Sequence, residues 1–427
     1  MATGLIVTYL LLSLAAGGAI AYVIGASSVL SFFALGQGDY LAILPQRMFS
    51  QLDVFAFLAM PLFILTGELM NRGGIAQALI DFSMAIVGRF KGGLGHVNIL
   101  TSVFFAGISG SAAADAAALS NTLVPQMRRQ GYSLNYAAAV TAASSIIGPI
   151  IPPSVILIFY GALMNVPIAA LFAAGVVPGL LLAGVLLGVN AIYARVQDHP
   201  GGRHAELPAL GPSLRKALPA LLLPVIILCG VLFGLTTPAE SAAIAVLAAL
   251  LIGWAYGELD RRQLGLACER TLVLLGAIFI ILCAISAFSY LTALAQWPQK
   301  ITAFVLDMGL APLQYLLVVN VVFLLAGMVM DVKAAVALLA PIFVPPALAM
   351  GVDPVHMGIV ICFNISLGLL SPPLGGVILI ISMVTGANYW QLIKATLPFF
   401  VIEVLLLAVL VMVPDVVLSL PVGLGLM

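Results

Sequence analysis

Residues 107–115 read Gly-Ile-Ser-Gly-Ser-Ala-Ala-Ala-Asp, and they interrupt an apolar segment that runs from about 97 to 127. The segment is longer than the roughly 20 residues that cross a bilayer, and small residues rather than charges break it. This pattern favours a re-entrant helical hairpin with the break at its tip. A second break, 144–153, reads Ser-Ser-Ile-Ile-Gly-Pro-Ile-Ile-Pro-Pro. Its three prolines exclude a regular helix, so we expect a discontinuous helix there.

The composition places these breaks in lipid. Of the 427 residues, 63% are hydrophobic and 7% are charged, whereas soluble domains average roughly 45–50% and 25%. The zero net charge excludes the basic surface of a nucleic-acid-binding protein. The sequence contains no phosphate loop and no metalloprotease or serine-hydrolase motif. The four cysteines stand singly, so we expect buried small hydrophobes rather than disulfides or zinc ligands. We predict an all-α integral membrane protein surrounded by lipid.

The second half of the chain repeats the order of the first. At a spacing of 220 residues, these positions coincide: Gly107 with Gly327, Gly148 with Gly368, and Pro152-Pro153 with Pro372-Pro373. Inside the hairpin we align the halves at a spacing of 216, which pairs Asp115 with Asp331. The ends of the first hairpin carry Lys and Arg, whereas those of the second carry mostly Asp. Because cytoplasmic loops collect basic residues, we predict two inverted repeats.

The predicted organisation follows from these segments. We expect one or more N-terminal transmembrane helices at 1–44, a first repeat at 45–195, a cytoplasmic loop at 196–216, central scaffold helices at 217–265 and a second repeat at 266–427. The hairpins are expected at about 93–127 and 312–349, and the discontinuous helices at about 133–164 and 355–385. Each repeat therefore contains one re-entrant hairpin and one broken transmembrane helix.

The breaks carry the chemistry. Carbonyls freed at a break, together with the hydroxyls of Ser109 and Ser111, make a hard-oxygen shell suited to a small cation, and half-helix N-termini favour an anion. Close packing of small residues is the structural alternative. Three breaks of this kind besides the first tip favour paired ion sites that flank a substrate. Asp115 and Asp331 are acidic at depth, so each is expected to ligate a cation, carry a proton, or cap its half-helix.

Five stretches spread over nearly the whole chain carry a resemblance to a known family. They are 60–70, 108–119, 148–154, 237–246 and 368–375. In this order they resemble the large, DctM-like membrane subunit of tripartite ATP-independent periplasmic (TRAP) transporters. The resemblance implies an elevator-type ion transporter fold in the bacterial inner membrane. It also implies a sodium gradient as the energy source, an organic acid delivered by a periplasmic binding protein, and a separate small four-helix membrane subunit.

The resemblance also implies site residues. For sodium they are Ser109, Gly110, Ser111, Ser145 and Gly148 in the first site, and Gly327, Asp331, Ser366, Gly368 and Ser371 in the second. Residues expected to support these sites or to contact substrate are Asp115, Ser144, Pro149 and Asn364. Many relatives have Thr where Ser371 stands, and the hydroxyl is kept. We expect no arginine in the cavity, so recognition there would depend on hydroxyls and helix ends.

The leading hypothesis is the large transmembrane subunit of a sodium-coupled secondary transporter that imports a small organic acid. A stand-alone cation- or proton-coupled anion symporter without a binding protein is the alternative within transport. An intramembrane enzyme would need a nucleophile with a base, or a metal cluster, and the sequence contains neither pattern. A channel is disfavoured because paired breaks in two inverted halves suit alternating access.

Overall fold

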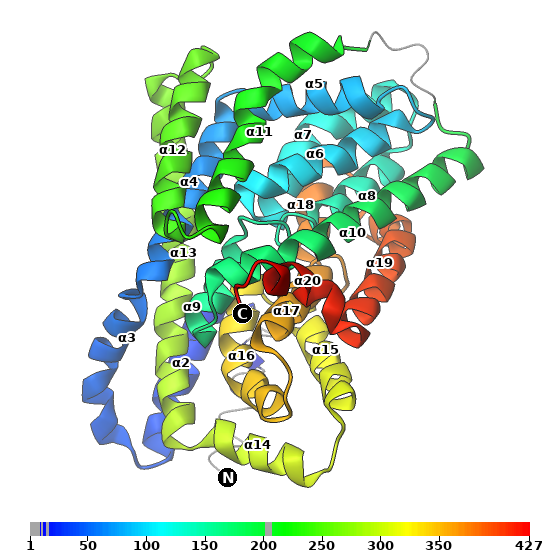
Figure 1. Cartoon of the computed structure of the whole chain (residues 1–427). Coiled ribbons are helices and arrows are strands. Elements are labelled where there is room, and N and C mark those ends of the chain that lie inside the picture. The colour runs from blue at the N-terminus through cyan, green and yellow to red at the C-terminus, as the bar shows by residue number, and fades with distance from the viewer. Residues whose placement is uncertain (1–8, 10–11, 14–16, 201–206) are drawn as a thin grey trace.

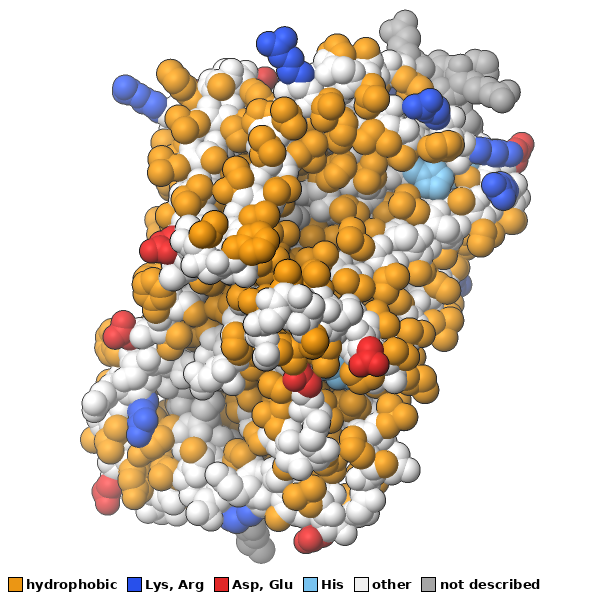
Figure 2. Space-filling view, viewed as in Figure 1, with side chains coloured by type: hydrophobic (Ala, Val, Ile, Leu, Met, Phe, Trp, Pro, Cys, Tyr) orange, Lys and Arg blue, Asp and Glu red, His pale blue; other side chains and the backbone are white. Residues whose placement is uncertain are grey.

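The computed structural model describes residues 9, 12–13, 17–200 and 207–427, and over these residues the regular structure is entirely helical (Figure 1). The prediction of an all-α protein is confirmed. Seven of the described helices are long and apolar enough to cross a membrane, or eight if the bent pair 38–52 and 55–72 counts as one span. Hydrophobic side chains cover most of the face in Figure 2. An apolar surface of this extent requires lipid as its solvent, so the chain is a multi-pass membrane protein.

The N-terminal part and the middle of the chain supply two groups of helices, in which η1 and η2 are short 3-10 helices. The first group is α2 (Ile20–Ala34), η1 (Gly38–Ile43), α3 (Leu44–Leu52), η2 (Phe55–Leu58), α4 (Ala59–Arg72) and α5 (Ile75–Val87). The second is α11 (Leu210–Leu232), α12 (Pro238–Ala255), α13 (Arg261–Leu294) and α14 (Trp297–Asp307). Helix α4 packs against α12 and α13, and α13 also packs against α2 and α3. Of the predicted N-terminal region 1–44, residues 1–8, 10–11 and 14–16 lie outside the described residues.

Two groups of five helices share one order of elements. Module 1 consists of α6 (Gly93–Ser109), α7 (Ala112–Arg129), α8 (Leu134–Ser145), α9 (Val155–Met164) and α10 (Ile168–Val196). Module 2 consists of α15 (Pro312–Val329), α16 (Val332–Ala349), α17 (Pro354–Gly368), α18 (Gly376–Thr385) and α19 (Tyr389–Met412), and α20 (Pro414–Gly423) follows it. In Figure 1, α6 and α7 lie in the upper half of the molecule, whereas α15 and α16 lie in the lower half.

The helix bounds correct the alignment of the two hairpins. Helix α6 ends at Ser109 and α15 at Val329, while α7 begins at Ala112 and α16 at Val332, so the spacing stays at 220 through both tips. The expected slip to 216 is wrong. The spacing of 216 paired Asp115 with Asp331 because both are acidic. In the structure, residues correspond when they lie at the same distance from the helix ends at the two tips. Asp331 therefore corresponds to Ser111, and Asp115 corresponds to the buried Ala335.

Each hairpin consists of two helices separated by two residues. The first of these residues follows the end of one helix, and the second caps the start of the next helix. We call Gly110-Ser111 tip 1 and Met330-Asp331 tip 2. Gly110 adopts φ +58°, a left-handed conformation that ends α6, and the Ser111 hydroxyl accepts a hydrogen bond of 3.5 Å from the Ala114 N–H. At tip 2 the Asp331 carboxylate accepts one of 3.0 Å from the Lys333 N–H. Caps of this kind satisfy helix-end donors that have no water to bind in lipid.

The broken helices form the centre of the molecule. Every residue from Tyr136 to Ser145 in α8 and from Val355 to Gly368 in α17 is buried. The cis-linked pairs Pro152-Pro153 and Pro372-Pro373 lie in the two breaks. The Ser154 hydroxyl donates to the Pro149 carbonyl over 2.5 Å and caps α9. The irregular backbone of the first break, residues 146–154, is thus enclosed by protein, whereas Pro372, Pro373 and Leu374 of the second break are exposed.

The central polar stretch and the cysteines differ from expectation. Helix α11 begins at Leu210, inside the stretch 196–216 that we predicted to be a loop, of which 201–206 lie outside the described residues. Ser213, Ala217 and Ala220 form a buried stripe at helical spacing there, so the adjacent basic residues remain exposed. Cys229 and Cys268 are exposed rather than buried, because each lies on an outward face of a long apolar helix.

Candidate functional site

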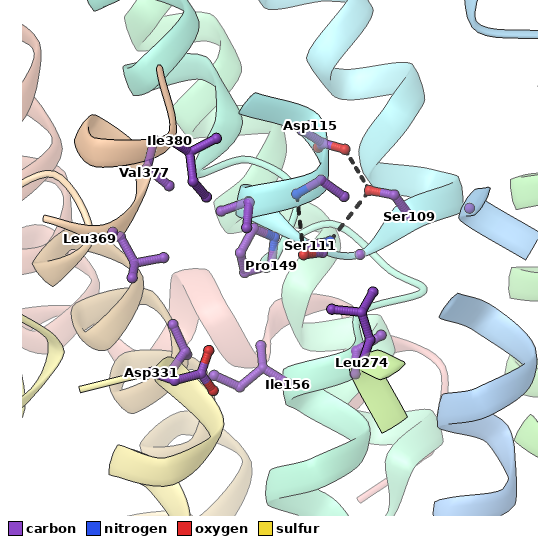
Figure 3. A pocket seen from close by; sticks show the side chains of 18 of the residues that line it. Ser109, Ser111, Asp115, Pro149, Ile156, Leu274, Asp331, Leu369, Val377 and Ile380 are labelled. Atoms are coloured by element: carbon purple, nitrogen blue, oxygen red, sulfur yellow. Dashed lines mark hydrogen bonds between the residues drawn. The ribbon is translucent and has the colours of Figure 1, made fainter. Parts of the chain in front are cut away.

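A cavity of about 440 Å³ lies between the two hairpin tips (Figure 3). Its lining comes from tip 1, tip 2, the second half-helices α9 and α18, and the flanking helices α4, α5 and α13. In Figure 3, Ser109, Ser111 and Asp115 lie on one side of the cavity and Asp331 lies on the other. Both modules therefore contribute walls to one space, although 220 residues separate corresponding positions.

Tip 1 surrounds a buried carboxylate. The Ser109 hydroxyl donates a hydrogen bond of 2.5 Å to Asp115 Oδ1 and accepts one of 3.3 Å from the Ser111 N–H. The Asp115 side chain is fully buried, and among the described residues its Oδ2 atom has no hydrogen-bond partner. A carboxylate oxygen left unpaired away from water carries a large desolvation penalty. A bound cation or a proton would offset this penalty.

Gly148 brings the first broken helix against this carboxylate. A Cβ at position 148 would lie 2.7 Å from Asp115 Oδ2 and 3.3 Å from the Ser145 carbonyl oxygen, so only glycine permits this approach. A Cβ at Gly110 would lie 2.6 Å from the Pro153 carbonyl oxygen. The structure thus places Gly148 beside Ser111 and beside Asp115, which was expected only in a supporting role, while the Ser145 carbonyl accepts a hydrogen bond of 3.2 Å from the Gly148 N–H. Pro149 lies beside them in the cavity wall.

The donor set at tip 1 suits a small hard cation. It offers one carboxylate oxygen without a partner, the hydroxyls of Ser109 and Ser111, and the Ser145 carbonyl. Carboxylate, hydroxyl and carbonyl oxygens are the ligands that hard cations prefer. Among the described residues no group of three or more His, Cys, Asp or Glu side chains is placed to hold a metal, so a transition-metal site is not indicated.

Tip 2 is built differently, from backbone contacts. A Cβ at Gly368 would lie 2.4 Å from the Gly327 carbonyl carbon, and one at Gly327 would lie 2.5 Å from the Ile365 carbonyl oxygen. Helices α15 and α17 therefore cross in direct contact. The buried hydroxyls of Ser366 and Ser371 bond within their own segment, to the carbonyls of residues 362 (2.6 Å) and 367 (3.5 Å).

Asp331 faces the cavity at tip 2. Its side chain is 49% exposed, its Oδ1 accepts from the Lys333 N–H, and its Oδ2 lies 3.7 Å from Lys333 Nζ. Among the described contacts none joins Asp331 to Ser366 or Ser371. The structure therefore brings Gly327 to Gly368 and leaves Asp331 apart from the two serine hydroxyls.

Ser144 and Asn364, the corresponding support residues, tie each hairpin to its broken helix. Buried Ser144 exchanges hydrogen bonds with Ser102 at 2.9 Å and Asn98 at 3.0 Å, which joins α8 to α6. Buried Asn364 donates to the Asn320 carbonyl at 2.9 Å, which joins α17 to α15. Polar contacts at this depth hold each hairpin against its broken helix, although Asn364 Oδ1 has no hydrogen-bond partner among the described residues.

Three polar residues of the cavity wall were not among the site residues expected from the sequence. Glu68 and Asn71 of α4 line the cavity, and so does Lys333 of α16. The Glu68 carboxylate lies 3.5 Å from Arg72 Nε. No arginine lines the described cavity, as expected. The rule that an ionisable residue in an apolar segment marks function would have found Lys333 as readily as Asp331.

Comparison with known proteins gives consistent relationships over nearly the whole chain. The family described as "Tripartite ATP-independent periplasmic transporter, DctM component" matches residues 7–416. The C4-dicarboxylate TRAP transporter large permease protein DctM of Pseudomonas aeruginosa is 38% identical, over 94% of this chain and 93% of that protein. The sialic acid TRAP transporter large permease protein SiaM of Vibrio cholerae is 36% identical, over 92% of both.

A third relative and one solved structure extend these relationships. The 2,3-diketo-L-gulonate TRAP transporter large permease protein YiaN of Escherichia coli is 33% identical, over 88% of this chain and 89% of that protein. The crystal structure of the YdaH transporter of Alcanivorax borkumensis has a TM-score of 0.59 and 18% identity, over 99% of this chain and 98% of that one. At that identity the likeness concerns the fold alone.

Proposed function

Because the chain belongs to the DctM component family of tripartite ATP-independent periplasmic transporters, and is thus a transporter subunit rather than an enzyme, we propose that it imports a small organic acid together with sodium. The observation that carries this proposal is the cavity walled by both tips, with the unpartnered carboxylate oxygen of Asp115 at one side. The named substrates of the three relatives are all organic acids. The substrate class is therefore a carboxylate or sugar acid.

The geometry of tip 1 supports the proposal of sodium coupling. A cation bound by Asp115, Ser109 and Ser111 would neutralise the buried carboxylate and hold the tip against Gly148. The second sodium would bind near Gly327, Gly368 and Asp331, together with the segment that contains Ser366 and Ser371. Filling both sites orders both tips and completes the cavity for the anion, so empty and fully loaded states move while half-loaded states do not.

The movement we propose is of the elevator type. The two modules, as inverted repeats, would move as one body against the helices α2, α4, α11, α12 and α13. Small residues meet where the two parts touch: a Cβ at Gly67 of α4 would lie 3.4 Å from Ser109 Cα, and a Cβ at Gly107 of α6 would lie 2.7 Å from Pro224 Cβ of α11. Moving parts that meet through small residues slide with few side chains to disengage.

The proposed setting is the inner membrane of a bacterium. A small four-helix membrane subunit would pack beside this chain, and a periplasmic binding protein would deliver the acid, as the TRAP architecture of the relatives implies. The lipid-facing surface leaves long apolar helices for that subunit and for membrane lipid. The binding protein would then supply much of the choice among acids.

Uptake into proteoliposomes tests the proposal. The chain is reconstituted with its small subunit, and labelled C4-dicarboxylate, sialic acid and diketogulonate are offered with and without candidate binding proteins. We expect uptake of one of these acids that requires both a binding protein and an inward sodium gradient. Uptake that persists unchanged without the sodium gradient rejects sodium coupling, and a response to a pH gradient instead identifies proton coupling. Uptake without any binding protein identifies a stand-alone symporter.

A further inference from the structure

Lys333 lies at the start of α16, a position where a lysine does not stabilise the helix. It is the second residue of α16, near the positive end of the helix dipole, where a cation is unfavourable. Its side chain is 23% exposed and lines a cavity whose walls are mostly apolar. A charge at this depth is costly unless it has a partner. The placement therefore calls for a role beyond the folding of α16.

The cavity holds one basic side chain against several acidic ones. Among the described residues that line it, Lys333 is the only Lys or Arg, while Glu68, Asp115 and Asp331 are acidic. Glu68 lies 3.5 Å from Arg72, which is outside the lining, and Asp115 is held by Ser109. Among the described lining residues, an anion that enters the cavity thus meets a single cation, the ammonium of Lys333.

The pairing of Lys333 with Asp331 is loose. The Nζ to Oδ2 distance is 3.7 Å, whereas a charge-assisted hydrogen bond measures about 2.7–2.9 Å. Both side chains reach the cavity, and Oδ1 of Asp331 is independently anchored by the Lys333 N–H. The ammonium has three donors, so it has capacity for another anion. The ion pair is therefore exchangeable, while the cap on α16 is retained.

From these contacts we infer that Lys333 binds a carboxylate group of the transported acid and, in doing so, exchanges partners with Asp331. In this structure the Lys333 ammonium is the ion-pair partner of the Asp331 carboxylate. When a sodium ion takes over Asp331, the ammonium is released to the substrate carboxylate. Each ligand then lowers the cost of binding the other, because each replaces one half of an ion pair that would otherwise be left unpaired. This inference rests on the proposed function and assigns the substrate contact within it.

The test measures anion and sodium binding separately in Lys333→Gln. At saturating sodium, we expect the KM for the acid to rise about tenfold or more, because a charge-assisted contact is lost. Without substrate, we expect the sodium concentration that half-saturates thermal stabilisation of the complex to fall about fivefold, because Asp331 has lost a competing cation. Lys333→Arg should keep most of the affinity for the acid. Lys394→Gln, an exposed lysine of α19 outside the cavity, is the matched control and should change neither quantity.

The opposite directions of the two changes separate this role from a structural one. Loss of affinity for both ligands with a lower melting temperature would mean that Lys333 only stabilises tip 2, and unchanged values for both would remove it from the site. Either result overturns the exchange while wild-type uptake keeps the proposed function intact. If the wild-type complex takes up no organic anion under any gradient, the proposed function fails, and the exchange fails with it.

Discussion

Tips 1 and 2 occupy equivalent places in the two modules, yet they handle charge in different ways. Tip 1 seals its carboxylate: Asp115 is fully buried four residues into α7, bound to Ser109 and packed against Gly148. Tip 2 keeps its carboxylate at the helix start: Asp331 is about half exposed and pairs loosely with Lys333. The two modules therefore share the helix break and its cap, whereas the charged group lies behind the tip in module 1 and at the surface of the tip in module 2.

This difference assigns different tasks to the two tips. A sealed carboxylate with one unpaired oxygen suits a cation that is held away from water. An exposed carboxylate paired with an ammonium suits exchange of ions with the cavity. We therefore expect tip 1 to determine cation binding and tip 2 to determine how that binding is linked to the anion.

The largest effect is expected at tip 1. Asp115→Asn removes the charge that the proposed cation needs and turns an amide toward Gly148, so sodium-driven uptake should fall about a hundredfold or more. Initial uptake rates in proteoliposomes measure this. Asp353→Asn, which caps α17 outside the cavity and keeps a good cap residue, is the control. Near-normal uptake by Asp115→Asn would contradict the claim that tip 1 binds the cation through its buried carboxylate.

The next effect concerns backbone contacts at tip 2. Gly368→Ala should lower the stability of the complex by about 1–3 kcal/mol, because its Cβ would meet the Gly327 backbone, which cannot yield. Gly148→Ala at tip 1 should destabilise less, since it meets the Asp115 side chain, but it should still abolish sodium-driven uptake. Thermal unfolding measures the stability loss of Gly368→Ala, and proteoliposome uptake measures the loss of transport in Gly148→Ala. Gly276→Ala, in open space on α13, should leave both unchanged.

A moderate effect is expected at the ties between hairpins and broken helices. Asn364→Ala leaves Asn320 without its buried partner, and Ser144→Ala does the same to Asn98 and Ser102, so each should cost about 1–3 kcal/mol. Thermal unfolding of the two variants measures this. Similar losses would mean that both modules hold their hairpins alike and differ only at the tips. A loss of stability in only one of the two variants would show that the modules also differ in how the hairpin is held against its broken helix.

The smallest effect is expected at the cap of tip 2. Asp331→Asn should change stability by less than about 0.5 kcal/mol, because Asn caps a helix as well as Asp and the side chain is half exposed. Uptake should nevertheless fall, since the exchangeable charge is gone. A drop in melting temperature as large as that of Gly368→Ala would show that Asp331 makes buried contacts, and the tips would then be alike.

The sequence was informative where local chemistry determines the backbone. Gly110 adopts a left-handed conformation, and the prolines of 149–153 and 372–373 cannot continue a regular helix, so the break at tip 1 and those in both broken helices were predictable. The alignment of Asp115 with Asp331 failed because it matched two acids, whereas caps determine equivalence and any of Ser, Thr, Asp or Asn serves as a cap.

The contacts of the site were less predictable than its position. That Gly148 would lie against Asp115 depends on how α8 packs on the hairpin more than 30 residues away, which spacing does not encode. Lys333 follows Asp331 by two positions in an apolar segment, so the rule that marks Asp331 as a functional candidate applies to Lys333 as well. Glu68 was separated from the tips by a whole helix, and only the fold places it in the cavity wall.

Sodium-dependent stabilisation of the purified membrane complex tests the central claim most directly. A ligand that binds only the folded state raises the melting temperature, and tip 1 is proposed to bind sodium through Asp115. We predict that sodium, compared with equal concentrations of potassium, raises the melting temperature of the wild-type complex, and that Asp115→Asn removes most of this rise. An equal rise in both proteins would contradict the account, because the cation would then bind without the carboxylate on which tip 1 is built.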